Sequence, residues 1–151
     1  MEATVKIWKK SREKYLNFLN NYNLEQLNTT PTGLSNNLIW NIGHVVVAQQ
    51  SLVYKGAGIP MHISDELYDR YKSGTFPSGT TTQEEVDELR ELLVSLIGKT
   101  ENDYKNGVFT TYNERTTGTG FHLATIKDAF EFNNYHEGMH LGMMMNIRKF
   151  V

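Results

Sequence analysis

The segment between Glu25 and Lys55 contains no charged side chain, and this feature restricts the folds that the chain can adopt. Its second half is almost continuously apolar, so a helix there must be buried on most of its sides. Polar side chains nevertheless interrupt the segment every few positions, at Asn36, Asn37, Asn41, His44, Gln49 and Gln50. A membrane span needs about 20 mostly apolar residues and would not tolerate these interruptions. We therefore predict a helix from just after Ser35 to about Tyr54, buried inside a soluble protein.

Three further segments have the spacing of amphipathic helices. The first covers roughly residues 4–22, and its apolar stripe faces either the core or a partner. The next opens at Thr82, which forms a predicted capping box with Glu85. The last begins near a second capping residue and covers about residues 125–149.

These patterns predict an all-α fold with four helices. Regular alternation of apolar and polar residues does not persist beyond Val108–Tyr112, so a sizeable sheet is not expected. A length of 151 residues fits one domain that covers residues 1–151. About 26 residues join the second and third helices and could extend ~80 Å, whereas a helix of about 20 residues is only ~30 Å long. The connection can therefore cross the bundle, and residues 64–70 within it can form a short capped helix.

The chain contains no cysteine. This excludes a disulfide framework, a thiolate zinc site, an iron–sulfur cluster and a cysteine nucleophile, so any metal must be held by nitrogen and oxygen. The formal net charge of −2, from 15 Lys and Arg against 17 Asp and Glu, does not indicate nucleic acid or an anionic membrane as a partner. The first residues mix charged with apolar side chains and lack the features of a targeting segment, so we expect a cytoplasmic protein.

Three of the five histidines give the main indication of chemistry. His136 and His140 are four residues apart on a helical pattern, so their imidazoles lie about one turn apart and can share a metal ion. His44 lies midway along the uncharged helix, where an imidazole is costly to bury unless its ring nitrogens have partners. Three neutral imidazoles leave one open position on a four-coordinate ion, which is typical of a reactive site. The alternative is that each histidine is a hydrogen-bonded core residue.

Several neighbours could support such a site. Asn41 and Asn133 each precede one of these histidines by three residues and could hydrogen-bond close to it. Glycines that could let two helices approach closely, or merely relieve packing, are Gly43, Gly138 and Gly142. Large apolar side chains that we expect in the core rather than in a cofactor site are Trp40, Phe132 and the Met143–Met145 run.

The segment from His136 to His140 also matches H-E-x-x-H, the zinc peptidase signature in which Glu137 would be the general base. That interpretation requires a further ligand downstream. No acidic residue and no further histidine of the metzincin pattern follows, so the third ligand must come from upstream. His44 is the best candidate.

Two segments resemble the DinB superfamily. Leu38–His44 is similar to the W-x-x-G-H stretch on that family's second helix, and His136–Gly142 is similar to the H-x-x-x-H-x-G-Q motif on its last helix. The resemblance implies an up-down-down-up four-helix bundle, usually a homodimer, with a nickel or zinc ion on His44, His136 and His140. Met143 stands where the family often has glutamine, so the polar contact of that glutamine is absent here.

The resemblance also bears on activity. Characterised relatives in the family include S-transferases that use bacillithiol or mycothiol and a mycothiol-dependent maleylpyruvate isomerase. We therefore expect a metal-dependent thiol S-transferase that activates a low-molecular-weight thiol. Asn41, Asn133 or Glu137 could orient a ligand or move a proton, although Glu137 points about 100° away from His136 around the helix. The alternatives are metal-dependent hydrolysis of a small ester or amide, and a non-catalytic protein that binds a metal or a small ligand.

Overall fold

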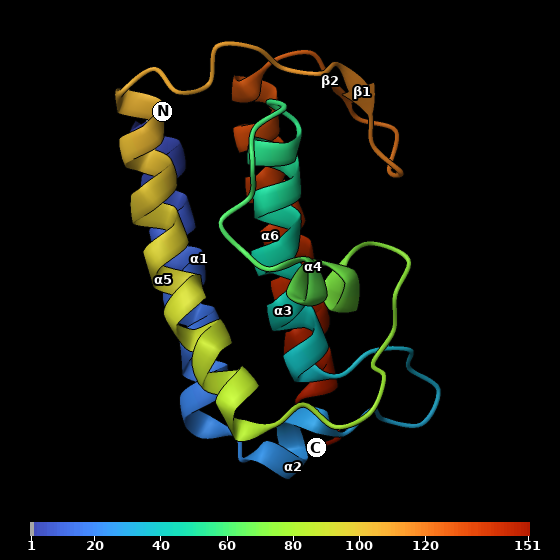
Figure 1. Cartoon of the computed structure of the whole chain (residues 1–151). Coiled ribbons are helices and arrows are strands. Elements are labelled where there is room, and N and C mark those ends of the chain that lie inside the picture. Colours follow the sequence, from blue (N-terminus) through green and yellow to red (C-terminus); the bar gives the residue numbers. More distant parts are fainter. Residues whose placement is uncertain (1) are drawn as a thin grey trace.

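The computed structural model describes residues 2–151, and most of these residues lie in helices (Figure 1). The elements in chain order are α1 (Glu2–Asn21), α2 (Leu24–Asn28), α3 (Leu38–Gln50), the π-helical turn η1 (Ser51–Lys55), α4 (Asp65–Tyr71), α5 (Gln83–Lys105), β1 (Arg115–Thr116), β2 (His122–Leu123) and α6 (Ile126–Ile147). The two strands are antiparallel, with Arg115 opposite Leu123 and Thr116 opposite His122. The prediction of an all-α protein is confirmed in that the described chain is mostly helical, with this short hairpin as its only sheet.

α3 is the helix that the uncharged segment predicts. It contacts α2, α4, α5 and α6 and continues directly into η1. Every residue of α3 except Ala48 is buried, an environment that charged side chains almost never enter without partners. The helix begins after Asn37, whose side-chain oxygen accepts a hydrogen bond from the Trp40 amide at 2.8 Å. None of the helices within residues 2–151 is both long enough and apolar enough to cross a membrane.

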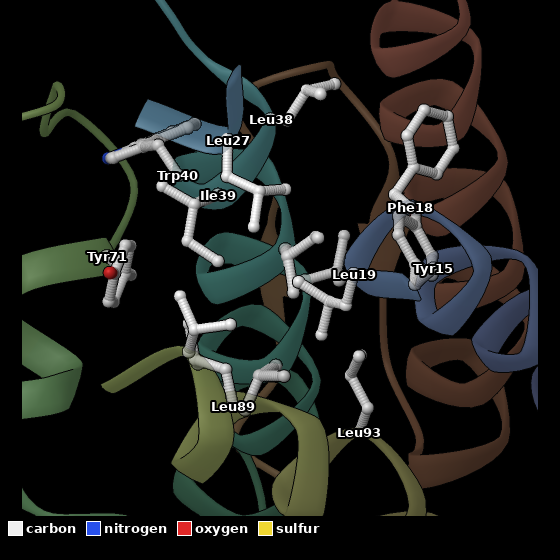
Figure 2. Packing of buried hydrophobic residues seen from close by; sticks show 14 of the residues in the cluster. Tyr15, Phe18, Leu19, Leu27, Leu38, Ile39, Trp40, Tyr71, Leu89 and Leu93 are labelled. Atoms are coloured by element: carbon white, nitrogen blue, oxygen red, sulfur yellow. The ribbon is translucent and has the colours of Figure 1, made fainter. Parts of the chain in front are cut away.

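The four long helices α1, α3, α5 and α6 lie side by side (Figure 1). α1 packs against α5 and α6, and α3 packs against the same two helices. Figure 2 shows part of the resulting core, in which the labelled buried side chains are Tyr15, Phe18, Leu19, Leu27, Leu38, Ile39, Trp40, Tyr71, Leu89 and Leu93. Full burial of each such large apolar side chain contributes ~1.5–3 kcal/mol. Trp8 and Tyr15 are 1% and 0% exposed, so the apolar stripe of α1 faces the core.

The starts of α5 and α6 differ. At α6, the Thr125 hydroxyl accepts from the Asp128 amide and the Asp128 carboxylate accepts from the Thr125 amide, which completes a capping box. At α5, the Thr82 hydroxyl accepts from the Glu85 amide at 3.3 Å, but the Glu85 carboxylate does not return to Thr82. That carboxylate accepts a hydrogen bond from the Tyr71 hydroxyl at 2.7 Å. The capping box predicted at Thr82 is therefore only half formed, because Glu85 joins α5 to α4 instead.

Of the short elements, the sequence predicts α4 but not α2 or the β1–β2 hairpin. α4 begins at the predicted place, where the Ser64 hydroxyl accepts from the Leu67 amide at 3.1 Å. α2 is not predicted from the sequence, because a helix of this length is too short to show a periodicity. A capping box between Asn23 and Gln26 starts it. The hairpin is not predicted either, because strands of two residues show no alternation.

The three glycines near the histidines do not share one role. Gly43 lies so close to the ring of Tyr71 that a methyl group added there would overlap it. Gly138 and Gly142 have open space at the same position, so the expectation that they allow close helix approach is wrong for both. Gly43 therefore lets α4, rather than α6, approach α3.

The large apolar side chains near the histidines are only partly core residues. Trp40 and Phe132 are buried, at 6% and 8% exposed, but both also line the cavity beside the histidines that is described below. In the methionine run, Met144 is fully buried, whereas Met143 and Met145 are 41% and 47% exposed. Successive helical residues point about 100° apart, so only one of three neighbours can face the core. The assignment of the whole run to the core is wrong.

Gly43→Ala tests the close contact between α3 and α4. We expect a loss of about 1–3 kcal/mol in the free energy of unfolding, because the new methyl group overpacks against Tyr71. Urea denaturation measures the change. The matched control is Gly98→Ala, an exposed helical glycine with open space, which should gain about 0.5–1 kcal/mol. Equal effects of the two substitutions would contradict the assignment.

Candidate metal centre

Three histidines from two helices meet in the structure. His44 projects from α3, and His136 and His140 project from α6. One ring nitrogen from each histidine lies within 4.8 Å of those from the other two. The group is compatible with a metal site, and it consists of the three residues that the sequence spacing singles out.

Hydrogen bonds fix the orientation of two of the rings. The Nδ1 atom of His44 lies 2.7 Å from the backbone oxygen of Tyr71, and Nδ1 of His140 lies 2.8 Å from Oδ1 of Asn41. Both oxygens can only accept, so each Nδ1 carries a proton and each Nε2 is left with a free lone pair. Asn41 is itself held, because its amide nitrogen donates to the Asn37 carbonyl at 2.7 Å. This is how metal-binding imidazoles are held by their outer neighbours.

The spacing of the nitrogens also fits a metal ion. Nε2 of His44 and Nε2 of His136 are 3.2 Å apart. Two nitrogens on one tetrahedral ion, with bonds of ~2.0–2.1 Å, are separated by ~3.3 Å. Nδ1 of His136 has no hydrogen-bond partner within the described chain. The donor set is three imidazole nitrogens, which suits zinc, nickel, copper or iron.

Burial keeps all three imidazoles neutral. Desolvation, together with the neighbouring His140 and His44, lowers the pKa of His136 to about 2. Desolvation also lowers the pKa of His140, to about 3, and that of His44. A neutral imidazole is the form that binds a metal, so these rings are ready to bind at neutral pH without first losing a proton.

A cavity of about 630 Å³ opens beside the histidines and is lined by all three of them. This volume is typical of a pocket for a small molecule. The wall includes side chains from α3, η1, α6 and the β1–β2 hairpin. Trp40 lines the cavity and stacks on His44, with ring centroids 4.8 Å apart and planes 8° apart. Met143, which stands at the position of the family glutamine, also lines it.

The other candidate residues lie in different surroundings. Asn41 bonds to His140, as described above. Asn133 lies away from the cavity wall and donates to Oε1 of Glu137 at 2.8 Å. Glu137 is fully buried, forms an ion pair with Arg12 at 2.7 Å and does not line the cavity either. The zinc peptidase interpretation, with Glu137 as general base, therefore has no support in the geometry.

Two residues that shape the site are missed by the sequence reasoning. Arg12 lies on the apolar stripe of α1, four residues after Trp8 and three before Tyr15, and a lone charge at such a position signals a buried partner. Tyr71 acts on His44 through its backbone oxygen, and no side-chain pattern can reveal that contact.

Comparison with known proteins identifies a family and a solved structure that are similar to this chain. A family model described as the DinB superfamily matches residues 7–144. The crystal structure of a conserved protein from Enterococcus faecalis is similar to this chain, with a TM-score of 0.68 and 13% sequence identity over 99% of this chain and 95% of that one. At this identity the likeness shows the fold alone. No curated protein matches the chain significantly.

The lowered pKa values predict acid sensitivity of the metal-free protein. Below pH 6.5 the unfolded chain takes up protons on histidines whose folded pKa values are about 2 and about 3, so stability falls as the pH falls. The limit is ~1.4 kcal/mol per pH unit for each such histidine. Urea denaturation at about pH 7 and about pH 5 measures the loss, which should be smaller in His136→Gln. The exposed-site control His122→Gln should keep the wild-type loss, and a wild-type stability that does not change with pH would contradict the argument.

Proposed function

The chain belongs to the DinB superfamily, and we propose that it is a metal-dependent thiol S-transferase that holds one zinc or nickel ion on His44, His136 and His140. The observation that carries this proposal is the convergence of three neutral imidazoles on the wall of an open cavity. Three protein ligands leave room for a substrate, as in catalytic rather than structural sites.

A divalent ion at this position would lower the pKa of a thiol that reaches it and supply a thiolate at neutral pH. The chain has no cysteine, so the sulfur must arrive with a small-molecule substrate. The protein's own residues would orient the metal-binding imidazoles and shield the reacting sulfur from water. Tyr71 and Asn41 hold two imidazoles in place, and Trp40 and Phe132 supply apolar wall that limits water around the reacting sulfur.

Among residues 2–151, none of the side chains that line the cavity is a carboxylate, and Glu137 is engaged by Arg12. Neither thiol transfer nor hydrolysis would therefore have a carboxylate base here, and an ion on the three histidines would lower the pKa of a bound thiol or of a bound water. We place thiol transfer first because of the resemblance to thiol-dependent enzymes of the family, and metal-dependent hydrolysis of a small ester or amide remains the alternative.

A second candidate function is non-catalytic binding of a metal or a small ligand. Met143 favours it, because a thioether lines the cavity where the family often has a polar glutamine. A methionine offers only a weak acceptor and no donor. Any step that uses the amide of that glutamine would be lost in this chain.

We also propose the overall organisation that the family implies. The contacts of α1 and α3 with α5 and α6 support an up-down-down-up bundle in one domain over residues 1–151. In Figure 1, α3 and α5 run in one direction, and α1 and α6 run in the other. The long crossover that contains α4 joins α3 to α5. We also propose that the protein is a homodimer and that it is cytoplasmic.

Metal titration tests the site. We expect one zinc or nickel ion per chain, and at least a ~10–100-fold loss of affinity in His44→Ala and His140→Ala, because even an outer partner of a ligand contributes this much. Calorimetry and elemental analysis of the purified protein measure it. His62→Ala, which removes a histidine outside the cavity, should bind like the wild type. Equal metal content in all four proteins would rule out the site.

Turnover tests the chemistry. The metal-loaded protein should join a low-molecular-weight thiol to an alkyl halide, and His44→Ala should not. In this step the thiolate sulfur forms the new C–S bond, the C–halogen bond breaks, halide leaves and the thiol proton passes to the solvent. Loss of the free thiol, followed with a colorimetric reagent across a panel of thiols, gives the rate. A protein that binds the metal but is inert towards every thiol would favour the binding function. If Met143→Gln then gained activity, the loss of thiol transfer in the wild type would be due to the methionine at this position.

A further inference from the structure

The charged side chains around the cavity are of one sign. Lys72, which ends α4, and Arg115, on β1, line the same cavity as the three histidines. No Asp or Glu in the described chain lines it. Hydroxyl groups supply much of the remaining polar wall, at Ser51, Ser73, Thr116, Thr117 and Thr119. A ligand therefore meets cations and hydrogen-bond donors but no anionic side chain.

Arg115 is the more available of the two cations. Its side chain has no carboxylate within ion-pair distance among residues 2–151. The adjacent Glu114 pairs with His122 at 3.0 Å, across the hairpin. The pairing of β1 with β2, in which Arg115 lies opposite the buried Leu123, fixes the backbone that carries it. A guanidinium group carried on such a backbone can bind a carboxylate or phosphate through two parallel hydrogen bonds.

Lys72 can contribute in spite of a partner. Its ammonium group lies 2.7 Å from the Asp69 carboxylate, but both side chains are well exposed, at 44% and 65%. An exposed pair of this kind is weak and exchanges readily. The ammonium group has three donors, so it can contact an anion in the cavity while it keeps Asp69.

We propose that the substrate bound in this cavity carries a carboxylate or phosphate group, which Arg115 binds with help from Lys72 while another part of the molecule faces the histidines. This inference deepens the proposed function and rests on it for the identity of the reacting group. The wall of the cavity attracts an acidic molecule and repels a basic one, which sets specificity as well as affinity. The acidic group belongs either to the thiol or to the electrophile that it attacks.

The first arm of the test uses straight-chain mercaptocarboxylates of increasing length, each compared with its own neutral carboxamide. Calorimetry of the zinc-loaded protein measures the dissociation constants. At one or more chain lengths the acid should bind about tenfold more tightly than the amide, and this ratio should approach one in Arg115→Gln and fall in Lys72→Gln. Using the ratio within each variant cancels the difference in acidity between the two thiols.

The second arm uses glutarate, which has no thiol, with the metal-free protein. Chemical-shift mapping should show changes at the amides of residues 73–74 and 116–119 in the wild type and not in Arg115→Gln. A response to glutarate without any acid preference among the thiols would assign the acidic group to the electrophile. A response to glutarate when no thiol binds at all would contradict the S-transferase proposal and leave this inference standing.

Two matched controls remove exposed cations that do not line the cavity. Arg148→Gln and Lys127→Gln should keep the wild-type ratio and the wild-type glutarate response. The inference is overturned if acids and amides bind equally to the wild type and glutarate has no effect. It is also overturned if the control variants lose the preference to the same extent as Arg115→Gln, because general surface charge would then explain it.

Discussion

The buried ion pair between Arg12 and Glu137 holds together the helices that carry the three clustered histidines. The two side chains are 3% and 1% exposed and their closest atoms are 2.7 Å apart. The same guanidinium group donates to the Val45 carbonyl at 3.3 Å, and the Asn133 amide donates to the carboxylate at 2.8 Å. One charge pair thus connects α1, α3 and α6. Removing one partner of such a pair leaves an uncompensated buried charge, at a cost of ~3–5 kcal/mol.

The ion pair also sets the rotation of α6. Glu137 follows His136 directly, so the two side chains point about 100° apart around the helix axis. Once Arg12 holds Glu137 towards α1, His136 and His140 lie about 100° and about 60° away from it around the helix axis, and both face the cavity. The H-E-x-x-H pattern therefore separates two tasks. Its histidines face the ligand space, whereas its glutamate anchors the helix.

Local sequence predicts much of this fold and only part of the site. The absence of charge before Lys55 identifies the buried helix α3, because burial penalises charge wherever the helix packs. The spacing of His136 and His140 identifies their shared face. Asn41 shares a face with His44, three residues later, but the ring that it bonds is that of His140 across the interface with α6. Asn133 shows the limit of that rule. It is three residues from His136 and four from Glu137, and only the packing of α1 decides that it bonds to the glutamate.

Other features depend on contacts between distant segments, which no periodicity encodes. Glu85 has the right type and spacing to complete a capping box, yet its carboxylate accepts from the Tyr71 hydroxyl in α4. The backbone of Tyr71 holds His44, and its ring fills the space that Gly43 leaves. One residue of the long crossover therefore contacts α3 twice and α5 once. A pattern read along one helix cannot reveal such a residue.

These contacts divide the metal centre into a rigid and an adjustable part. His44 and His140 each have Nδ1 bonded to an oxygen whose own position is fixed, by the backbone of Tyr71 and by the Asn41 bond to Asn37. His136 has no such bond within the described chain, although Nδ1 is buried. A buried polar atom without a partner costs ~1–3 kcal/mol. The ring of His136 therefore lacks the hydrogen bond from Nδ1 that orients each of the other two rings. In the proposed metal site, two oriented imidazoles would therefore define where the ion binds, and the less constrained ring of His136 could adjust to it.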